Sequence, residues 1–117
     1  MKQYGMHTDV NGTKRWYKNN KLHRLDGPAI EYANGDKWWY VNNKLHREDG
    51  PAVVWANGTK QWYVNGERHR LDGPAYEDGD GYKAWWLNDS RYSSFDDWLE
   101  AVDVSDEQKV FLKLKWT

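Results

Sequence analysis

The chain contains no cysteine, only two phenylalanines and no long run of apolar residues. The lack of cysteine excludes disulfides and thiol chemistry. No segment approaches the length of a membrane span, and residues 1–5 lack the apolar core of a signal peptide. We therefore expect one cytoplasmic domain of 117 residues with no membrane insertion.

The sequence also lacks an excess of charge of one sign, since 17 Lys and Arg oppose 18 Asp and Glu. Duplex nucleic acid needs a clustered excess of basic residues, so it is excluded as a partner. What the chain has instead is aromatic residues, which make up 16% of it, including 9 Trp and 8 Tyr. Because aliphatic residues are scarce, the core must be built largely from Trp and Tyr.

An internal repeat of 23 residues organises most of the chain. The string His-Arg-Leu-Asp-Gly-Pro-Ala at 23–29 recurs with Glu in place of Leu at 46–52, and unchanged at 69–75. The same period relates Gly12, Gly35, Gly58 and Gly81, and likewise Trp16, Trp39, Trp62 and Trp85. Three full units and a partial one therefore share one pattern.

Each unit has the pattern of β-hairpins. Asn34-Gly35 and Asn57-Gly58 lie between β-rich runs, and Asn-Gly favours a two-residue type I′ turn. Second turns are expected at 42–43 and 65–66, and the Asp-Gly-Pro strings turn the chain into the next unit. The sequence predicts a mainly β protein, with residues 1–92 forming an antiparallel meander in a single twisted sheet.

The expected turn also predicts the register, in which Ile30 opposes Trp39 and Ala29 opposes Tyr40. One face would then carry Pro28, Ile30, Tyr32, Lys37, Trp39 and Val41, and would be the core. The other would carry Ala29, Glu31, Ala33, Asp36, Trp38 and Tyr40. On this second face we expect a shallow groove with a floor of alanine and walls of tyrosine.

The string Asn-Gly-x-x-x-Trp-Tyr-x-Asn-Gly-x-x-His at 57–69 resembles the MORN repeat. It departs from a typical MORN unit after the His, where Arg-x-Asp-Gly-Pro-Ala replaces Gly-x-Gly. The chain, over residues 10–92, is similar to the variant MORN-like arrays of tailed phages and giant viruses. The resemblance implies an elongated twisted sheet that serves as a binding surface, for proteins or for lipids.

Residues 93–117 change to helical periodicity and belong to the same domain. Ser94 and Ser105 are the expected N-caps of two short helices. Phe95, Trp98, Leu99 and Val102 form the apolar side of the first helix, and Val110, Phe111 and Leu114 that of the second. We expect these helices to cap the open end of the array, with docking of a partner as the alternative.

The recurring His-Arg-x-Asp string resembles a base with its orienting carboxylate, but an active site would not occur three times. We expect Asp26, Asp49 and Asp72 to bond turn backbone, and each His to pack beside a Trp. Since His23, His46 and His69 would be separated by at least two strand spacings of ~4.8 Å, they predict no shared metal site. The sequence indicates no enzyme and no cofactor.

What remains is an aromatic and basic surface. The candidate binding residues are Trp38, Tyr40, Arg47, Tyr63, Arg68, Arg70 and Trp86, whereas Trp16, Trp39, Trp62 and Trp85 are expected in the core. Trp, Tyr and Arg dominate protein interfaces, so a protein partner is the leading hypothesis. From the viral resemblance, the partner would be a host protein, such as a defence factor, inhibited in the host cytoplasm. A nucleotide or small molecule held between aromatic walls and Arg is the alternative. The oligomeric state and the face that binds stay open.

Overall fold

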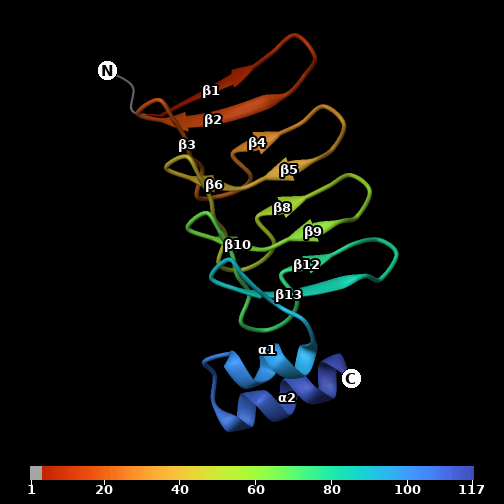
Figure 1. Ribbon diagram of the computed structural model, residues 1–117. Coiled ribbons are helices and arrows are strands. Elements are labelled where there is room, and N and C mark those ends of the chain that lie inside the picture. Colours follow the sequence, from red (N-terminus) through yellow and green to blue (C-terminus); the bar gives the residue numbers. More distant parts are fainter. Residues whose placement is uncertain (1–3) are drawn as a thin grey trace.

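The computed structural model describes residues 4–117. Residues 1–3 lie outside it. They begin both the predicted repeat region and the N-terminal segment that was expected to lack a signal peptide. Four long hairpins stack side by side (Figure 1). They are β1 (Tyr4–Thr8) with β2 (Lys14–Lys18), β4 (Ile30–Glu31) with β5 (Lys37–Trp38), β8 (Val53–Val54) with β9 (Lys60–Gln61), and β12 (Tyr76–Glu77) with β13 (Lys83–Leu87). With β3 (Lys21–Leu22) and β14 (Ser90–Tyr92) they form one open antiparallel sheet, which confirms the predicted meander.

Short hairpins lie at the other end of each unit (Figure 1). β6 (Tyr40–Val41) pairs with β7 (Lys44–Leu45), and β10 (Tyr63–Val64) pairs with β11 (Glu67–Arg68), as separate two-stranded sheets. Their turns contain two residues with positive φ, such as 49° at Asn42 and 68° at Asn43. These are the torsions of a type I′ turn, so the second turns of each unit lie where the sequence predicted them.

The long hairpins turn at the predicted Asn-Gly pairs, but the predicted turn type is wrong. The Tyr32 N–H donates to the Asp36 carbonyl, and the Gly35 N–H donates to the Tyr32 carbonyl. The loop therefore holds three residues, 33–35. Only Gly35 has positive φ, at 100°, and Asn34 instead accepts the Asp36 N–H through its side chain. A type I turn followed by a left-handed glycine fits this pattern.

The extra loop residue shifts the register by one, so the predicted pairs Ile30–Trp39 and Ala29–Tyr40 do not form. Ile30 lies opposite Trp38, and Glu31 lies opposite Lys37. Because side chains alternate along a strand, a shift of one residue exchanges the faces. Ile30 thus shares a face with Trp38, here called the tyrosine face. Trp16, Trp39, Trp62 and Trp85 define the opposite, tryptophan face. Ala29, Ala52 and Ala75 are at most 1% exposed, so they do not form the floor of an open groove as expected.

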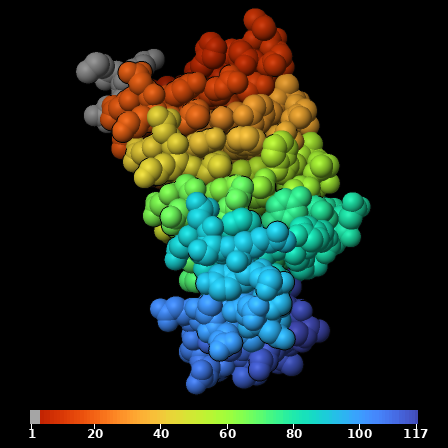
Figure 2. Space-filling view, viewed as in Figure 1, coloured from red at the N-terminus to blue at the C-terminus, as the bar shows by residue number. Residues whose placement is uncertain are grey.

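Two helices pack at the C-terminal end of the array (Figures 1 and 2). α1 (Phe95–Ala101) begins at the N-cap Ser94, and α2 (Asp106–Trp116) begins at Ser105 with a capping box to Gln108. Both predicted starts are confirmed. The side chains of α1 pack against the last repeat in the main apolar core, which contains Trp85, Leu87, Trp98, Leu99, Val102 and Leu112.

The predicted apolar side of α2 is wrong. Val110, Phe111 and Leu114 are 58, 65 and 75% exposed, whereas Leu112 is buried. Trp116, one turn beyond Leu112, packs against the same core. The contacts with α1 and the last repeat decide which side of α2 faces inward. These contacts cannot be predicted from the spacing of apolar residues along the helix alone. No helix in residues 4–117 is long and apolar enough to cross a membrane.

Candidate binding grooves on the tryptophan face

The recurring Trp, Arg and Asp residues form one unit in each repeat. The guanidinium carbon of Arg47 lies 4.1 Å from the centre of the Trp39 ring. Its Nε donates to the Asp49 carboxylate at 3.1 Å, and Nη1 donates to the Pro51 carbonyl at 3.0 Å. The same contacts join Trp16, Arg24, Asp26 and Pro28, and also Trp62, Arg70, Asp72 and Pro74. The Asp and Pro oxygens hold each guanidinium flat on its indole.

The expectation that Asp26, Asp49 and Asp72 bond turn backbone is therefore corrected, since each carboxylate accepts its bond from Arg. The hydrogen bond from Arg24, followed by its charge, lowers the pKa of Asp26 below its ordinary value. The motif glycine is also explained. A Cβ at Gly50 would lie 2.9 Å from the Arg47 guanidinium carbon, so only glycine lets the arginine cross the turn.

Open cavities of about 430, 610 and 600 Å³ follow one another along the tryptophan face. We call them the first, second and third grooves. The second lies between the loop at Arg24 and Asp26 and the ring of Trp39. The third lies between the loop at Arg47 and Asp49 and the ring of Trp62. The grooves therefore repeat with the period of the sequence.

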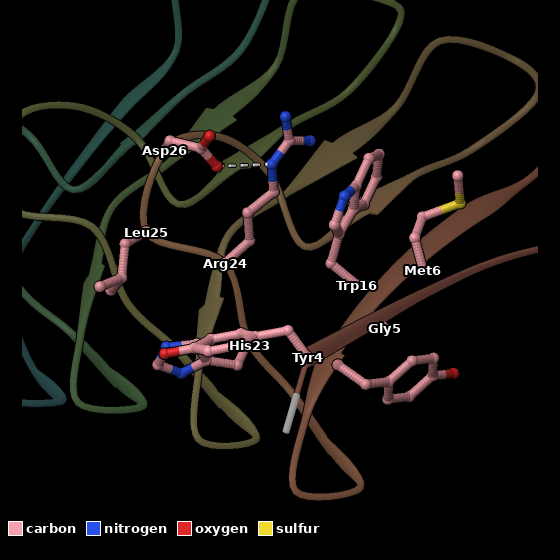
Figure 3. A pocket seen from close by; sticks show the side chains of 9 residues that line it. Tyr4, Gly5, Met6, Trp16, His23, Arg24, Leu25 and Asp26 are labelled. Carbon is pink, nitrogen blue, oxygen red and sulfur yellow. Dashed lines mark hydrogen bonds and ion pairs between the residues drawn. The ribbon is translucent and has the colours of Figure 1, made fainter. Parts of the chain in front are cut away.

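The first groove differs because no complete repeat precedes it. Its wall on that side is the edge strand β1, through Tyr4 and Met6. Figure 3 shows Arg24 extending beside Trp16, with its bond to Asp26 drawn as a dashed line. Leu25, which lines both the first and the second groove, is 79% exposed.

The fourth position of this series is filled by the C-terminal helices. The Trp85 ring, equivalent to Trp39 and Trp62, lies 4.9 Å from Trp98 and 5.7 Å from Trp116 between ring centres. The Trp116 Nε1–H donates to the Asp72 carbonyl at 3.1 Å. Trp116 therefore lies between the Asp72 loop and Trp85, where an open groove would otherwise continue.

Trp116 also gives Arg70 a second aromatic neighbour. The guanidinium carbon of Arg70 lies 3.8 Å from the Trp62 ring centre and 5.5 Å from that of Trp116. The Arg70 side chain is 12% exposed, against 23% for Arg24 and 26% for Arg47. Arg24 and Arg47, each against one indole, are therefore the more exposed of the three arginines.

The rims of the grooves are acidic. Asp26, Glu48, Asp49 and Asp72 have side chains between 76 and 89% exposed, whereas the arginines below them are mostly buried. Nε and Nη1 of each guanidinium at the base are already bound to Asp and Pro oxygens. A ligand that enters a groove therefore meets carboxylates first and the flat side of a guanidinium below them.

The motif histidines join neighbouring repeats. Nδ1 of His23, His46 and His69 accepts the backbone N–H of Asn42, Asn65 and Asn88 respectively, at 2.9 to 3.2 Å. An accepting Nδ1 requires a neutral imidazole with its proton on Nε2. These imidazoles are therefore structural links along the array, and the described residues contain no group of three or more His, Asp or Glu that could hold a metal.

Five of the predicted binding residues belong to the tyrosine face. Trp38 packs between Tyr32 and Trp55, with both ring distances 5.4 Å. Tyr40 is half-buried, and burial raises its pKa, with smaller contributions from Tyr32 and Tyr63. Arg68 donates to the Tyr63 hydroxyl at 3.2 Å and lies 4.7 Å from the Trp86 ring centre. Tyr63, Arg68 and Trp86 therefore lie together, and Trp38 is committed to its own aromatic cluster.

Arg47 and Arg70 do not share that surface, so the predicted grouping with Tyr40 and Tyr63 is wrong. Tyr40 lies opposite Leu45, and alternation two residues further would place Arg47 on the side of Tyr40, but β7 ends at Leu45. The chain then turns, and both arginines lie on the tryptophan face against Trp39 and Trp62.

Sequence reasoning also missed residues that form the grooves. Trp39 and Trp62 were expected in the core, yet they are only half-buried, and Trp85 alone of the series is buried. No role was predicted for Trp116 from the sequence. The available signal was the constant spacing of Trp, Arg and Asp in each repeat, as in Trp39, Arg47 and Asp49.

A comparison with protein-family models, curated proteins and solved structures finds no match for this chain.

Proposed function

We propose that this protein is a non-enzymatic binding module that holds another protein in the grooves of its tryptophan face. The observation that carries the proposal is the fourth groove, which a polypeptide segment already fills. The second and third grooves repeat its upper loop and its tryptophan, and they carry in addition an arginine on that tryptophan, where the fourth position has Ser93. Because the loop and the tryptophan recur in successive units, a segment that binds them at one position can bind them at the others.

The motif side chains support binding more than catalysis. Each His Nδ1 is bonded to backbone, and each Arg is bonded to Asp and Pro oxygens. A general base or an anion-binding arginine would need those atoms free. A host protein as the partner, in a viral setting, stays a prediction from the sequence resemblance.

A nucleotide is the weaker candidate. Its base would stack on Trp or Arg, but its phosphates would meet the exposed carboxylates of Asp26, Glu48 and Asp49. Nε and Nη1 of Arg47, two of the groups that would compensate them, are engaged at the base of the groove. Micromolar quenching of tryptophan fluorescence by a nucleotide would favour that alternative.

Site-specific photo-crosslinking tests the proposal. The crosslinker p-benzoylphenylalanine is placed at Leu25 or Leu71, which are exposed at the grooves, and at Asp80 in a distant hairpin turn as the control. We expect the same protein adduct from both groove positions and not from Asp80. Adducts of equal yield from all three positions, or none from the groove positions, would contradict binding on this face.

A further inference from the structure

The occupant of the fourth groove indicates what the open grooves recognise. Resting on the proposed function, we infer that the second and third grooves bind a protein segment that presents a tryptophan next to lysines. The natural model for that segment is the end of α2, where Trp116 follows Lys113 and Lys115.

The first step of the argument is the stacking position. In the fourth groove the Trp116 indole lies near Arg70, which also lies against Trp62. In the third groove Arg47 rests on Trp39 in the same way, with its outer side lining the cavity. Arg24 repeats this in the second groove. A ring entering either groove therefore completes a Trp–Arg–Trp stack.

The second step is a polar contact that selects tryptophan. The Trp116 indole N–H donates to the Asp72 main-chain carbonyl. The equivalent carbonyls of Asp26 and Asp49 accept no hydrogen bond from residues 4–117. Since an indole N–H needs an acceptor when it leaves water, these carbonyls favour Trp over Phe.

The third step is charge. The rim of the second and third grooves carries Asp26, Glu48, Asp49 and Asp72, all strongly exposed. Lysines beside the entering tryptophan would lie near these carboxylates. In the fourth groove Lys115 lies over the Trp116 ring and lines one cavity together with Asp72. An acidic segment would be repelled there.

NMR of the full-length, ¹⁵N-labelled protein with three short peptides tests the inference. The first is acetylated Lys-Leu-Lys-Trp, which copies residues 113–116. The second replaces its Trp with Ala, and the third replaces both Lys with Glu. The signals to follow are the side-chain Nε–H groups of Arg24, Arg47 and Arg70.

At millimolar Lys-Leu-Lys-Trp we expect ring-current shifts of the Arg24 and Arg47 signals and little change at Arg70, which Trp116 already covers. The Ala peptide should cause no such shifts. The Glu peptide should bind about threefold more weakly or worse, because surface charges contribute modestly. Equal shifts with the Ala peptide, or unmoved Arg24 and Arg47 signals, would overturn the inference.

A charge reversal gives the matched variant. Glu48 lines both the second and the third groove, and its only ion-pair partner in residues 4–117 is His46 at 3.6 Å. We expect Glu48→Lys to weaken binding of the Lys peptide about threefold or more and to strengthen that of the Glu peptide. Asp80→Lys makes the same charge change in an exposed turn outside the grooves and should alter neither.

The two proposals fail in different ways. If the peptides leave Arg24 and Arg47 unmoved while crosslinkers at Leu25 and Leu71 still capture one protein, the recognition of tryptophan and lysine is wrong and the binding function stands. If crosslinking from the grooves also gives no adduct, the tryptophan face is not the binding surface.

Discussion

The open third groove and the filled fourth groove share one side and differ on the other. Their loops, at 47–50 and 70–73, and their tryptophans, Trp62 and Trp85, are equivalent, yet Trp62 is half-buried and Trp85 is 8% exposed. Arg70 lies against Trp62, whereas Ser93 stands at the equivalent place for Trp85, which Trp98 and Trp116 of the helices cover instead. A repeat position thus specifies a side chain and its direction, and the neighbouring element decides whether that side chain is core or surface.

The largest expected effect comes from removing the indole that the helices cover. We expect Trp85→Ala to lower the free energy of unfolding by about 3–5 kcal/mol, because it empties the centre of the main core. Trp62→Ala removes the same side chain from a half-exposed site, and should cost less. Urea denaturation of both variants measures the difference, and equal losses would show that the helices do not create it.

Opening the fourth groove is the next largest change. Trp116→Ala removes the hydrogen bond to Asp72 and the second ring over Arg70. We expect a loss of about 1–3 kcal/mol in the free energy of unfolding, with the array itself still folded. The Arg70 Nε–H signal should then move toward the positions of Arg24 and Arg47. An unchanged Arg70 signal would contradict the stacking described for this groove.

Removing the carboxylate that orients an arginine should have a smaller effect. In Asp49→Ala, Arg47 loses one exposed ion pair but keeps its bond to the Pro51 carbonyl and its contact with Trp39. We expect about 0.5 kcal/mol, within the range of surface ion pairs. Asp72→Ala should behave alike, because Trp116 bonds the main-chain carbonyl of that residue. A loss above about 2 kcal/mol in thermal or urea unfolding would assign the carboxylate a larger structural role.

The smallest expected effect is a decline in stability at acid pH through His69, which links the third groove to the repeat beneath the helices. Burial lowers the pKa of His69 from 6.5, and the charge of Glu67 opposes that shift. The folded protein therefore binds this proton less tightly than the unfolded chain. Its contribution to stability is complete above the unfolded value and is lost as pH falls through the lower folded-state pKa.

Melting temperatures between pH 7 and pH 5 measure that decline. The variant His69→Gln cannot titrate, so its melting temperature should fall less over this range than that of the parent protein. Parallel curves for the two proteins would show that His69 does not carry the effect.

The fold was predictable because its signals are local. Asn-Gly and Asn-Asn pairs mark turns, and Ser94 and Ser105 mark helix starts, without reference to the rest of the chain. The register was not predictable from the same signals. Asn34-Gly35 fits both a two-residue and a three-residue loop, and the choice exchanges the faces of every residue in the hairpin.

The candidate site was harder to predict because it depends on contacts between distant segments. Arg47 reaches Trp39 only because the strand ends at Leu45, and Trp116 reaches Arg70 across 46 residues of chain. Composition predicted Trp, Tyr and Arg as the binding chemistry, and this stays a prediction. It could not assign Arg47 and Arg70 to one face and Tyr63 and Arg68 to the other.

The histidine links have a consequence for the evolution of the molecule. Each His bonds an Asn 19 residues later, so every repeat depends on its immediate neighbour alone. Deleting or duplicating 23 residues would rejoin equivalent positions and leave the helical cap unchanged. Two strand spacings separate successive grooves, a step of about 10 Å. The length of the array and its number of grooves can therefore change in whole steps of that size. The residues that line each groove stay the same.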